Sequence, residues 1–361
     1  MKIVYISPEN TVGTLGLWKK IHESRGNQCT TITLYKTKYH DNGDYCLQLP
    51  LIKSNKLYMW CRHTYYKLFV SPKGDYKELK GYPPTWKYNN FFERLYFKFR
   101  DWLWKRKVNS IIEKLNLLKF DVFHLEWGLE FYRDARFVKK IQKLQKPIIC
   151  TYHGQDLRTR GVIKKINDIS SLNLTSELDL LQKHPNINYL FLPFDTSKHK
   201  PKFTLNNPIK ICHSPTNRYY KGSDDIIKIC SSLKKYRSFE FILIENMSNK
   251  DALEIKNSCD ILIDQIHNRG GWGYGMNSVE ALSMGLCCLT ELIPEYQKFI
   301  SDHPFVNINI DNLEEKILNL LDNPKNIINQ KKISRDWVVK YHDINNVSSK
   351  LYEYYESIGV K

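Results

Sequence analysis

The sequence of 361 residues lacks several features that mark exported or membrane-spanning proteins. No apolar run reaches the roughly 18 residues that a membrane-spanning helix needs. The first residues, MKIVYISPEN, show no basic region, apolar stretch or cleavage site of a secretory signal. The nine cysteines include no CxxC pair, so their spacing favours neither a metal site nor a disulfide framework. We therefore expect buried thiols in a reducing cytoplasm.

Acidic residues are scarce relative to basic ones. The chain has 55 lysine and arginine residues against 38 aspartate and glutamate residues, which gives a formal net charge of +17. Such an excess indicates an anionic partner: a nucleotide, a nucleic acid or an acidic membrane surface. The hydrophobic fraction of 42% is ordinary for a globular protein, and the length favours two domains.

Short apolar runs of strand length alternate with helical patterns, which predicts an α/β fold. The predicted strands cover residues 2–7, 30–35, 120–126, 146–152, 188–195, 209–212, 239–245, 259–264 and 286–290. The polar, proline-bearing residues 196–208 are the predicted linker between two domains. The tail has a helical pattern over residues 333–358.

A glycine-rich stretch at residues 268–285, NRGGWGYGMNSVEALSMG, has the pattern of a ligand site. It follows the strand 259–264 and turns helical near Met276. A helix that begins after such a loop presents unpaired N–H groups and partial positive charge to an anion. Glu280, one turn inside, can accept two sugar hydroxyls, as an acidic residue does with ribose in dinucleotide sites. The spacing gives about equal support to a plain turn into a core helix with Glu280 solvated.

Two other strands end in polar residues. Arg218 and Lys221 follow the strand 209–212 and precede a helix, so they can neutralise a diphosphate, although plain surface cations are equally compatible with the pattern. His153 follows the strand 146–152 beside a glycine, where open α/β sheets bind ligands. A histidine there can also be simply hydrogen-bonded.

The loop after the first strand does not complete a dinucleotide fingerprint. Gly13 and Gly16 have no third glycine at the Rossmann interval, and no acidic residue ends the second strand. This disfavours a nicotinamide-dependent oxidoreductase.

Residues 53–108 form a basic, aromatic segment. Fourteen lysine or arginine residues stand against four acidic ones, among sixteen aromatic residues. Within it, residues 91–108 have helical spacing, and one face carries Phe92, Leu95, Tyr96, Phe99, Trp102 and Leu103. Such a helix fits an anionic membrane interface, with rings at the headgroups and cations on the lipid. The alternative is an amphipathic core helix with a solvated basic face, whereas no recognition motif supports a nucleic acid partner.

Taken together, these motifs resemble those of the retaining nucleotide-sugar glycosyltransferases of the GT-B fold, most closely glycosyltransferase family 4, over most of the chain. GWGYGMNSVEALSMGLCCLT is similar to the family's E-x7-E region, and HSPTNRYYKGSDDII to its phosphate-binding strand–loop–helix. TYHGQDLR resembles its histidine-bearing loop, and FLPFDTSKHKP the segment that joins its domains.

The resemblance implies two Rossmann-like domains facing an interdomain cleft. Residues 1–197 would hold the acceptor, residues 208–335 the nucleotide sugar, and residues 336–361 would form a helix that crosses back to the first domain. It also implies neither a metal nor a cofactor, because cations and a helix start would meet the diphosphate charge.

The site residues follow from the same resemblance. Glu280 would bind the ribose, His153 the transferred sugar, and Arg218 and Lys221 the diphosphate. Further donor contacts are expected at Thr216, Gly273, Tyr274, Gly275, Met276, Asn277 and Ser278, and an acceptor or phosphate loop at Gly13 and Thr14. The chain departs from the family pattern in two ways. Trp272 stands where the first family glutamate is expected, and Arg218 precedes Lys221 by three residues rather than about five.

The leading hypothesis is a cytoplasmic, membrane-peripheral retaining glycosyltransferase without a metal. It would move a hexosyl group from a nucleotide-diphosphate sugar to a glycan or lipid-linked acceptor in surface polysaccharide or glycoconjugate synthesis. Trp272 and the segment 53–108 motivate an alternative, a non-catalytic glycosyltransferase-like scaffold at the membrane.

Overall fold

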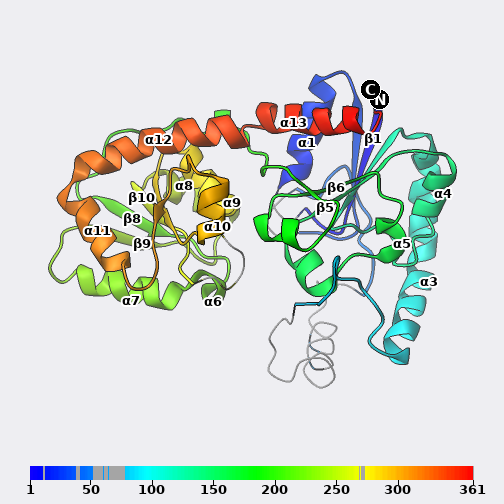
Figure 1. Cartoon of the computed structure of the whole chain (residues 1–361), viewed down its shortest axis with the longest axis horizontal. Helices are drawn as coiled ribbons and strands as arrows, with labels where there is room; N and C mark the ends of the chain where they lie inside the picture. The colour runs from blue at the N-terminus through cyan, green and yellow to red at the C-terminus, as the bar shows by residue number, and fades with distance from the viewer. Residues whose placement is uncertain are drawn as a thin grey trace. The chain divides into compact units, whose positions relative to one another are not determined.

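The structure is a computed structural model, and it describes residues 1–10, 13–37, 41–51, 60, 64, 78–267, 269 and 273–360. The chain divides into two compact units, which Figure 1 shows with their elements labelled. Unit 1 comprises Met1–Leu190 and Ser348–Lys361, and unit 2 comprises Phe191–Val347. The division thus falls at Leu190, shortly before the residues 196–208 in which the sequence analysis places the linker.

The sheet of unit 1 has seven parallel strands in the order β3-β2-β1-β4-β5-β6-β7. Parallel strands covered on both faces read as continuous apolar runs, and β1 accordingly buries every residue from Ile3 to Ser7. The strand order reverses between β1 and β4, and ligands bind at the carboxyl ends of strands around such a point. The strands are β1 (Lys2–Ser7), β2 (Gln28–Thr33), β3 (Tyr45–Cys46), β4 (Val122–Glu126), β5 (Ile148–Tyr152), β6 (Leu172–Thr175) and β7 (Asn188–Tyr189).

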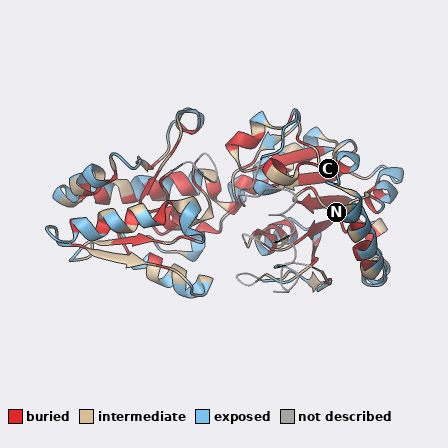
Figure 2. Ribbon diagram, turned by 90° about the horizontal axis from the view of Figure 1, so that it is seen from below, coloured by how far each residue is buried: buried red, intermediate tan, exposed pale blue. Residues whose placement is uncertain are grey.

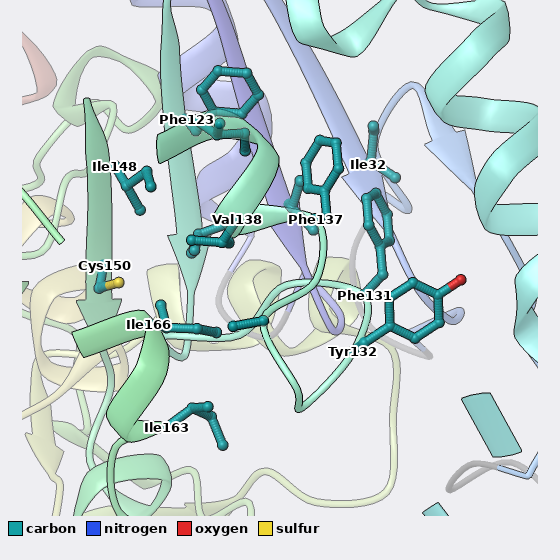
Figure 3. Packing of buried hydrophobic residues seen from close by; sticks show 14 of the residues in the cluster. Ile32, Phe123, Phe131, Tyr132, Phe137, Val138, Ile148, Cys150, Ile163 and Ile166 are labelled. Atoms are coloured by element: carbon teal, nitrogen blue, oxygen red, sulfur yellow. The ribbon is translucent and has the colours of Figure 1, made fainter. Parts of the chain in front are cut away.

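Helices cover both faces of this sheet, because successive residues of a strand point to opposite sides. Val4 and Ile6 of β1 share a buried cluster with Trp104 of α3 (Phe91–Lys114) and Val138 of α4 (Val138–Lys143). Figure 3 shows part of that cluster, with Phe123, Phe137 and Val138 close together. Tyr5, from the other face of β1, contacts His22 of α1 (Thr14–Ser24) and Tyr355 of α13 (Ile344–Ser357). The division between the units falls within α13, whose residues from Ser348 onward belong to unit 1. The remaining elements of unit 1 are α5 (Lys164–Asn167) and the short turns η1 (Leu117–Lys119), η2 (Asp156–Arg160) and η3 (Leu178–Gln182).

The sheet of unit 2 has five parallel strands in the order β12-β11-β10-β8-β9. Ile211, Ile261 and Cys287 form one buried face with α7 and α11, while α9 and α12 pack on the other face, against β11. Figure 2 shows the strands of both units largely buried and the outer helix surfaces exposed. The strands are β8 (Lys210–His213), β9 (Glu240–Leu243), β10 (Ile261–Ile263), β11 (Cys287–Thr290) and β12 (Val306–Asn307). The helices are α6 (Arg218–Lys221), α7 (Ser223–Leu233), α8 (Asn249–Asn257), α9 (Met276–Ser283), α10 (Pro294–Phe299), α11 (Leu313–Asp322), α12 (Pro324–His342) and the turn η4 (Thr196–Lys198).

A buried ion pair ties α12 to the sheet of unit 2. Lys331 Nζ lies 3.1 Å from Asp260 Oδ1, and both side chains are almost fully enclosed. Asp260 also accepts the backbone N–H of Lys210 at 3.0 Å, at the start of β8. The buried carboxylate of Asp260 therefore has both an opposite charge and a hydrogen-bond donor beside it, which offset the cost of removing it from water.

The tail is helical over most of residues 333–358, as predicted, but the helical stretch is interrupted at Asp343. The backbone of Phe194 pairs there: its N–H donates to His342 O at 2.8 Å, and its carbonyl accepts from Ile344 N–H at 2.9 Å. Asp343 consequently has extended backbone angles (φ −57°, ψ 132°), and α12 and α13 are separate helices.

The predicted helix over 91–108 is present as α3, but its environment differs from the core-helix alternative. Of the residues that the sequence places on one face, Phe92, Leu95, Phe99 and Trp102 are exposed. The other two, Tyr96 and Leu103, are half-buried, and Leu103 packs against the core. The core contacts come instead from the opposite side of the helix, at Phe97, Trp104, Val108 and Ile111. Among the described residues, no helix is both long and apolar enough to cross a membrane.

Candidate functional site

Asp264 organises the polar residues between β10 and α9. Its carboxylate is fully enclosed and accepts hydrogen bonds from Lys221 Nζ at 2.7 Å, Asn277 Nδ2 at 2.7 Å and Ser278 Oγ at 2.5 Å. Burial alone would raise the pKa of Asp264, but the charge of Lys221 and these hydrogen bonds bring it below its ordinary value. Asn277 and Ser278, expected as donor contacts, thus direct their side chains to Asp264.

Glu280 lies one turn inside α9, and its carboxylate forms an ion pair with a buried lysine. Lys256, at the end of α8, is only 2% exposed, and its Nζ lies 2.5 Å from Glu280 Oε2 and 2.7 Å from Asn277 Oδ1. The Glu280 side chain is 12% exposed, so it is neither solvated nor sealed in the core. Its Oε2 is fixed by Lys256, which gives the carboxylate a defined orientation.

The two glycines described before α9 have different physical roles. A Cβ on Gly273 would lie 2.2 Å from the ring of Tyr296, so the loop backbone needs glycine to pack against α10. A Cβ on Gly275, by contrast, would meet nothing within 4 Å. Gly275 is the N-cap residue of α9. The space beside Gly275 is therefore open, whereas Gly273 is tightly packed.

Tyr274 and Met276 flank Gly275 but differ in burial. The Tyr274 ring is buried against Phe305, and its hydroxyl lies 2.9 Å from Nε2 of His342. His342 Nδ1–H donates to the carbonyl of Leu192, and burial lowers the pKa of His342 to about 4, so Nε2 accepts from Tyr274. The side chain of Tyr274 is thus part of the core, while Met276 is half-buried at the helix start.

Both predicted phosphate-binding cations have carboxylate partners. Lys221 is shared between Asp264 and the side-chain oxygen of Gln265, at 3.0 Å. Arg218, at the start of α6, donates from Nε and Nη2 to the two carboxylate oxygens of Glu245, at 2.8 and 2.7 Å. Thr216 is exposed in the loop between β8 and α6. These residues lie near the carboxyl ends of β8, β9 and β10, where such sheets bind ligands.

In unit 1, His153 belongs to a charged cluster at the carboxyl ends of β4, β5 and β6. Its Nε2 is hydrogen-bonded to the carboxylate of Glu126, the last residue of β4, and its backbone N–H donates to Asp156 at 2.9 Å. Burial alone would lower the pKa of His153, but Glu126, together with the charges of Asp156 and Glu177, raises it above the ordinary value. Nearby, Arg158 bridges Glu177 and Asp179, at 2.7 and 2.5 Å.

Gly13 and Thr14 stand at the start of α1, after β1. Gly13 has a left-handed backbone (φ 73°), which glycine adopts without strain, and Thr14 is buried as the first helical residue. Thr11 and Val12, which belong to the same loop between β1 and α1, lie outside the described residues. Gly270, Gly271 and Trp272, the last of which stands at the position of the first family glutamate, also lie outside the described residues.

The sequence analysis did not single out the partners of the predicted residues, among them Glu126, Lys256 and Asp264. Glu126 and Asp264 do carry a sequence signal, because each is an acidic residue at the carboxyl end of a predicted strand. Lys256 carries none, since a single lysine in a polar helical stretch is ordinarily a surface residue.

Comparison with solved structures identifies the fold. Neither a protein-family model nor a curated protein matches the sequence. Anabaena HepE in complex with UDP-glucose superposes with a TM-score of 0.59 at 10% identity, over 99% of this chain and 100% of that one. An alpha-glucosyltransferase in complex with UDP and DNA gives 0.56 at 9% identity, over 98% of each chain. The UDP-GlcNAc 2-epimerase of Neisseria meningitidis bound to UDP-GlcNAc gives 0.56 at 12% identity, over 99% and 100%.

These likenesses, with two parallel-sheet α/β domains, establish that the chain has the GT-B fold, as the sequence analysis predicts. Because only about 10% of the residues are identical, these similarities establish the fold but not the reaction.

Proposed function

We propose that this protein is a glycosyltransferase that uses a nucleotide-diphosphate sugar. The observation that carries the proposal is the Glu280 carboxylate, which the buried Lys256 fixes one turn inside a helix that follows a glycine loop. A carboxylate fixed in this way can accept two adjacent ribose hydroxyls. The GT-B fold supports the proposal, since solved structures with this fold hold UDP or UDP-sugars.

Lys221 is our first candidate for the diphosphate. Its ammonium group has three N–H donors, so it can keep its bond to Asp264 and still donate to a phosphate oxygen. The N–H groups at the start of α9 would add partial positive charge, and Gly275 leaves space beside them. Arg218 would contribute after releasing part of its contact with Glu245, because the Arg218 side chain is half-exposed and such an ion pair is weak in water.

His153 is our candidate contact to the transferred sugar. The bond to Glu126 fixes the orientation of the imidazole ring and favours its charged form, which can donate to a sugar hydroxyl. Stabilisation of the leaving diphosphate by fixed charges would supply the main catalytic effect.

The finer assignments rest on the sequence resemblance. We propose that the reaction retains the anomeric configuration, that the transferred group is a hexosyl group and that the acceptor is a glycan or lipid-linked molecule of surface polysaccharide or glycoconjugate synthesis. We also propose that the reaction needs no metal or cofactor and takes place in the cytoplasm.

Nucleotide binding tests the donor site. A panel of nucleotide sugars is screened for thermal stabilisation, and the best ligand is then titrated by calorimetry. Glu280→Ala should weaken its affinity about 10- to 100-fold, because hydrogen bonds to a charged group are lost. Glu295→Ala, which removes an exposed glutamate on α10, is the matched control and should bind like the wild type. An unchanged affinity for Glu280→Ala would refute the assignment.

Product analysis separates transfer from the other activities of this fold. Appearance of the sugar on an acceptor supports a transferase, whereas conversion of the nucleotide sugar at one carbon supports an epimerase like the Neisseria relative. Slow hydrolysis of the donor excludes the scaffold alternative, and complete absence of turnover with bound donor favours it. NMR of the freshly formed linkage tests retention.

A further inference from the structure

Helix α3 presents large apolar side chains on the side that faces away from the core. Phe91, Phe92, Leu95, Phe99 and Trp102 are between 45% and 75% exposed. Successive helical residues lie about 100° apart, so these five side chains fall within about 100° of the helix circumference. We call them the outer face of α3. Figure 1 shows α3, in cyan, at the border of unit 1.

The opposite side of α3 is anchored firmly. It buries Phe97, Trp104, Val108 and Ile111 and the ion pair of Arg100 and Asp101, with 2.6 Å between Arg100 Nη2 and Asp101 Oδ1. The Arg100 guanidinium lies 4.0 Å from the Trp104 ring centroid, and Trp104 Nε1 donates to the carbonyl of Pro50 at 2.9 Å. The exposure of the outer face is therefore not a consequence of a loosely packed helix.

Cations border this apolar strip. Arg94, Lys98 and Lys105 are exposed, and by the same helical geometry they lie along one edge of the outer face. Aromatic rings beside a row of basic residues match the level of a bilayer where acyl chains meet phosphate groups. A second copy of the chain is a poorer occupant, because it would bring two basic edges together.

We infer that the outer face of α3 docks on a membrane surface rich in anionic lipid. The rings of Phe92, Phe99 and Trp102 would enter the interface while Lys98 and Lys105 contact lipid phosphates. Docking would be peripheral, in keeping with the described helices, none of which can span a bilayer. The inference does not depend on the proposed function, since vesicle binding is measured without a nucleotide sugar.

Sedimentation with vesicles tests the inference on the full chain. The wild type should sediment with vesicles that contain phosphatidylglycerol and stay in the supernatant with pure phosphatidylcholine. Phe92→Ser/Phe99→Ser/Trp102→Ser should lower the apparent affinity about tenfold or more, because the inserted apolar area is lost. Tyr236→Ser/Phe299→Ser, which removes exposed aromatic rings from unit 2, is the matched control and should bind like the wild type.

Two further measurements keep the test decisive. Lys98→Glu/Lys105→Glu should abolish the preference for anionic vesicles while keeping the apolar strip, and it serves if the triple variant does not fold. Brominated lipid should quench tryptophan fluorescence more in the wild type than in Trp102→Phe. Equal recovery in the supernatant for both vesicle types, or wild-type binding by the triple variant, would overturn the inference. So would a lipid-free dimer that the triple variant dissociates, since the face would then join two copies.

Discussion

At the scale of single residues, Lys256 determines how Glu280 can act. An enclosed lysine beside a partly enclosed carboxylate stabilises the fold only while both charges are present, because each offsets the desolvation of the other. The same contact restricts the rotation of the carboxylate. Nucleotide binding and stability should therefore both depend on a residue that we place outside the ligand's reach.

Lys256→Met should lower the stability of unit 2 by about 3–5 kcal/mol, because it leaves the Glu280 carboxylate without its partner. Nucleotide affinity should fall about tenfold, since a freely rotating carboxylate has more orientational freedom to lose on binding. Denaturant unfolding and calorimetry measure the two effects. Lys256→Met/Glu280→Gln should regain stability but not affinity, whereas full nucleotide affinity in Lys256→Met would contradict a positioning role.

His153 shows how a neighbouring element changes the meaning of a residue. From the sequence it is a histidine after a strand, with a hydrogen-bonded core residue as the ordinary interpretation. In the structure β4 runs beside β5 and brings Glu126 onto the imidazole, so that the pKa of His153 rises. A hydrogen-bonded histidine and a ligand-binding histidine are therefore compatible interpretations, because the bond to Glu126 orients the imidazole ring and raises its pKa.

At the scale of elements, the two described glycines of the loop before α9 differ in the space around them: Gly273 has no room for a Cβ, whereas Gly275 has. Gly273→Ala should destabilise unit 2 by about 1–3 kcal/mol, because its methyl group would overlap the Tyr296 ring at 2.2 Å. Gly275→Ala should keep the wild-type melting temperature, since the added Cβ meets nothing within 4 Å. If the start of α9 holds the diphosphate, Gly275→Ala should nevertheless weaken nucleotide binding.

Thermal unfolding and nucleotide titration of the two variants provide a matched comparison. A stable Gly273→Ala would mean that the loop does not pack against α10 as described. Wild-type affinity in Gly275→Ala would place the phosphates elsewhere.

Helix α3 shows that an apolar side predicted from periodicity is not necessarily the side that packs against the core. Periodicity identifies which side chains share a side, and four of the six residues so grouped, Phe92, Leu95, Phe99 and Trp102, are exposed together, whereas Tyr96 and Leu103 at the edge of that group are half-buried. A second apolar side, with Phe97, Trp104 and Val108, lies opposite and is the one that is buried. When both sides are apolar, the sequence pattern alone cannot choose which one faces the core.

At the scale of the whole molecule, the end of the chain is built into the first unit. Residues of α13 pack on β1 and α1: Nδ1 of His22 lies 2.8 Å from the Tyr352 hydroxyl, and its Nε2 lies 3.0 Å from the Tyr5 hydroxyl. His124 of β4 contacts Tyr355 from the same network. Stability of unit 1 therefore depends on residues about 330 positions away from its first helix.

This network predicts acid sensitivity of unit 1. Burial, and secondarily the charge of Arg25, lowers the pKa of His22 to about 4. Between pH about 6.5 and about 4 the unfolded chain binds a proton at His22 that the folded chain does not. Stability should therefore fall as the pH decreases through this window, by roughly 3 kcal/mol from His22.

Urea unfolding of unit 1, measured between pH 4 and 8, checks this expectation. His22→Gln should flatten the dependence below pH 6.5, and its stability difference from the wild type should be constant above pH 7.5, where His22 is neutral in both states. An unchanged slope in the variant would show that His22 does not titrate in this way.

Much of the architecture follows from the sequence alone, since strand-length apolar runs and helical periodicity are local patterns. They predicted β1, β4, β5, β8, β9, β10 and β11 close to their observed positions, and the α/β class with them. The short strands β3 and β12 were not predicted, because two residues carry no periodicity, and the four residues of β6 (Leu172–Thr175) were missed as well. The break at Asp343 was also missed, since it results from pairing with Phe194, a contact distant in sequence.

The sequence determined which residue types stand at strand ends: His153, Lys221, Asp264 and the loop leading to Glu280. The tertiary structure decided what those groups can do, because ion pairs join residues that the chain order separates, as Lys256 with Glu280 and Lys221 with Asp264. It also decided that Tyr274 faces the core and that the outer face of α3 faces solvent. Charge and hydrophobic periodicity are properties of the local sequence, whereas burial and ion pairing arise only after the sheets and helices have packed.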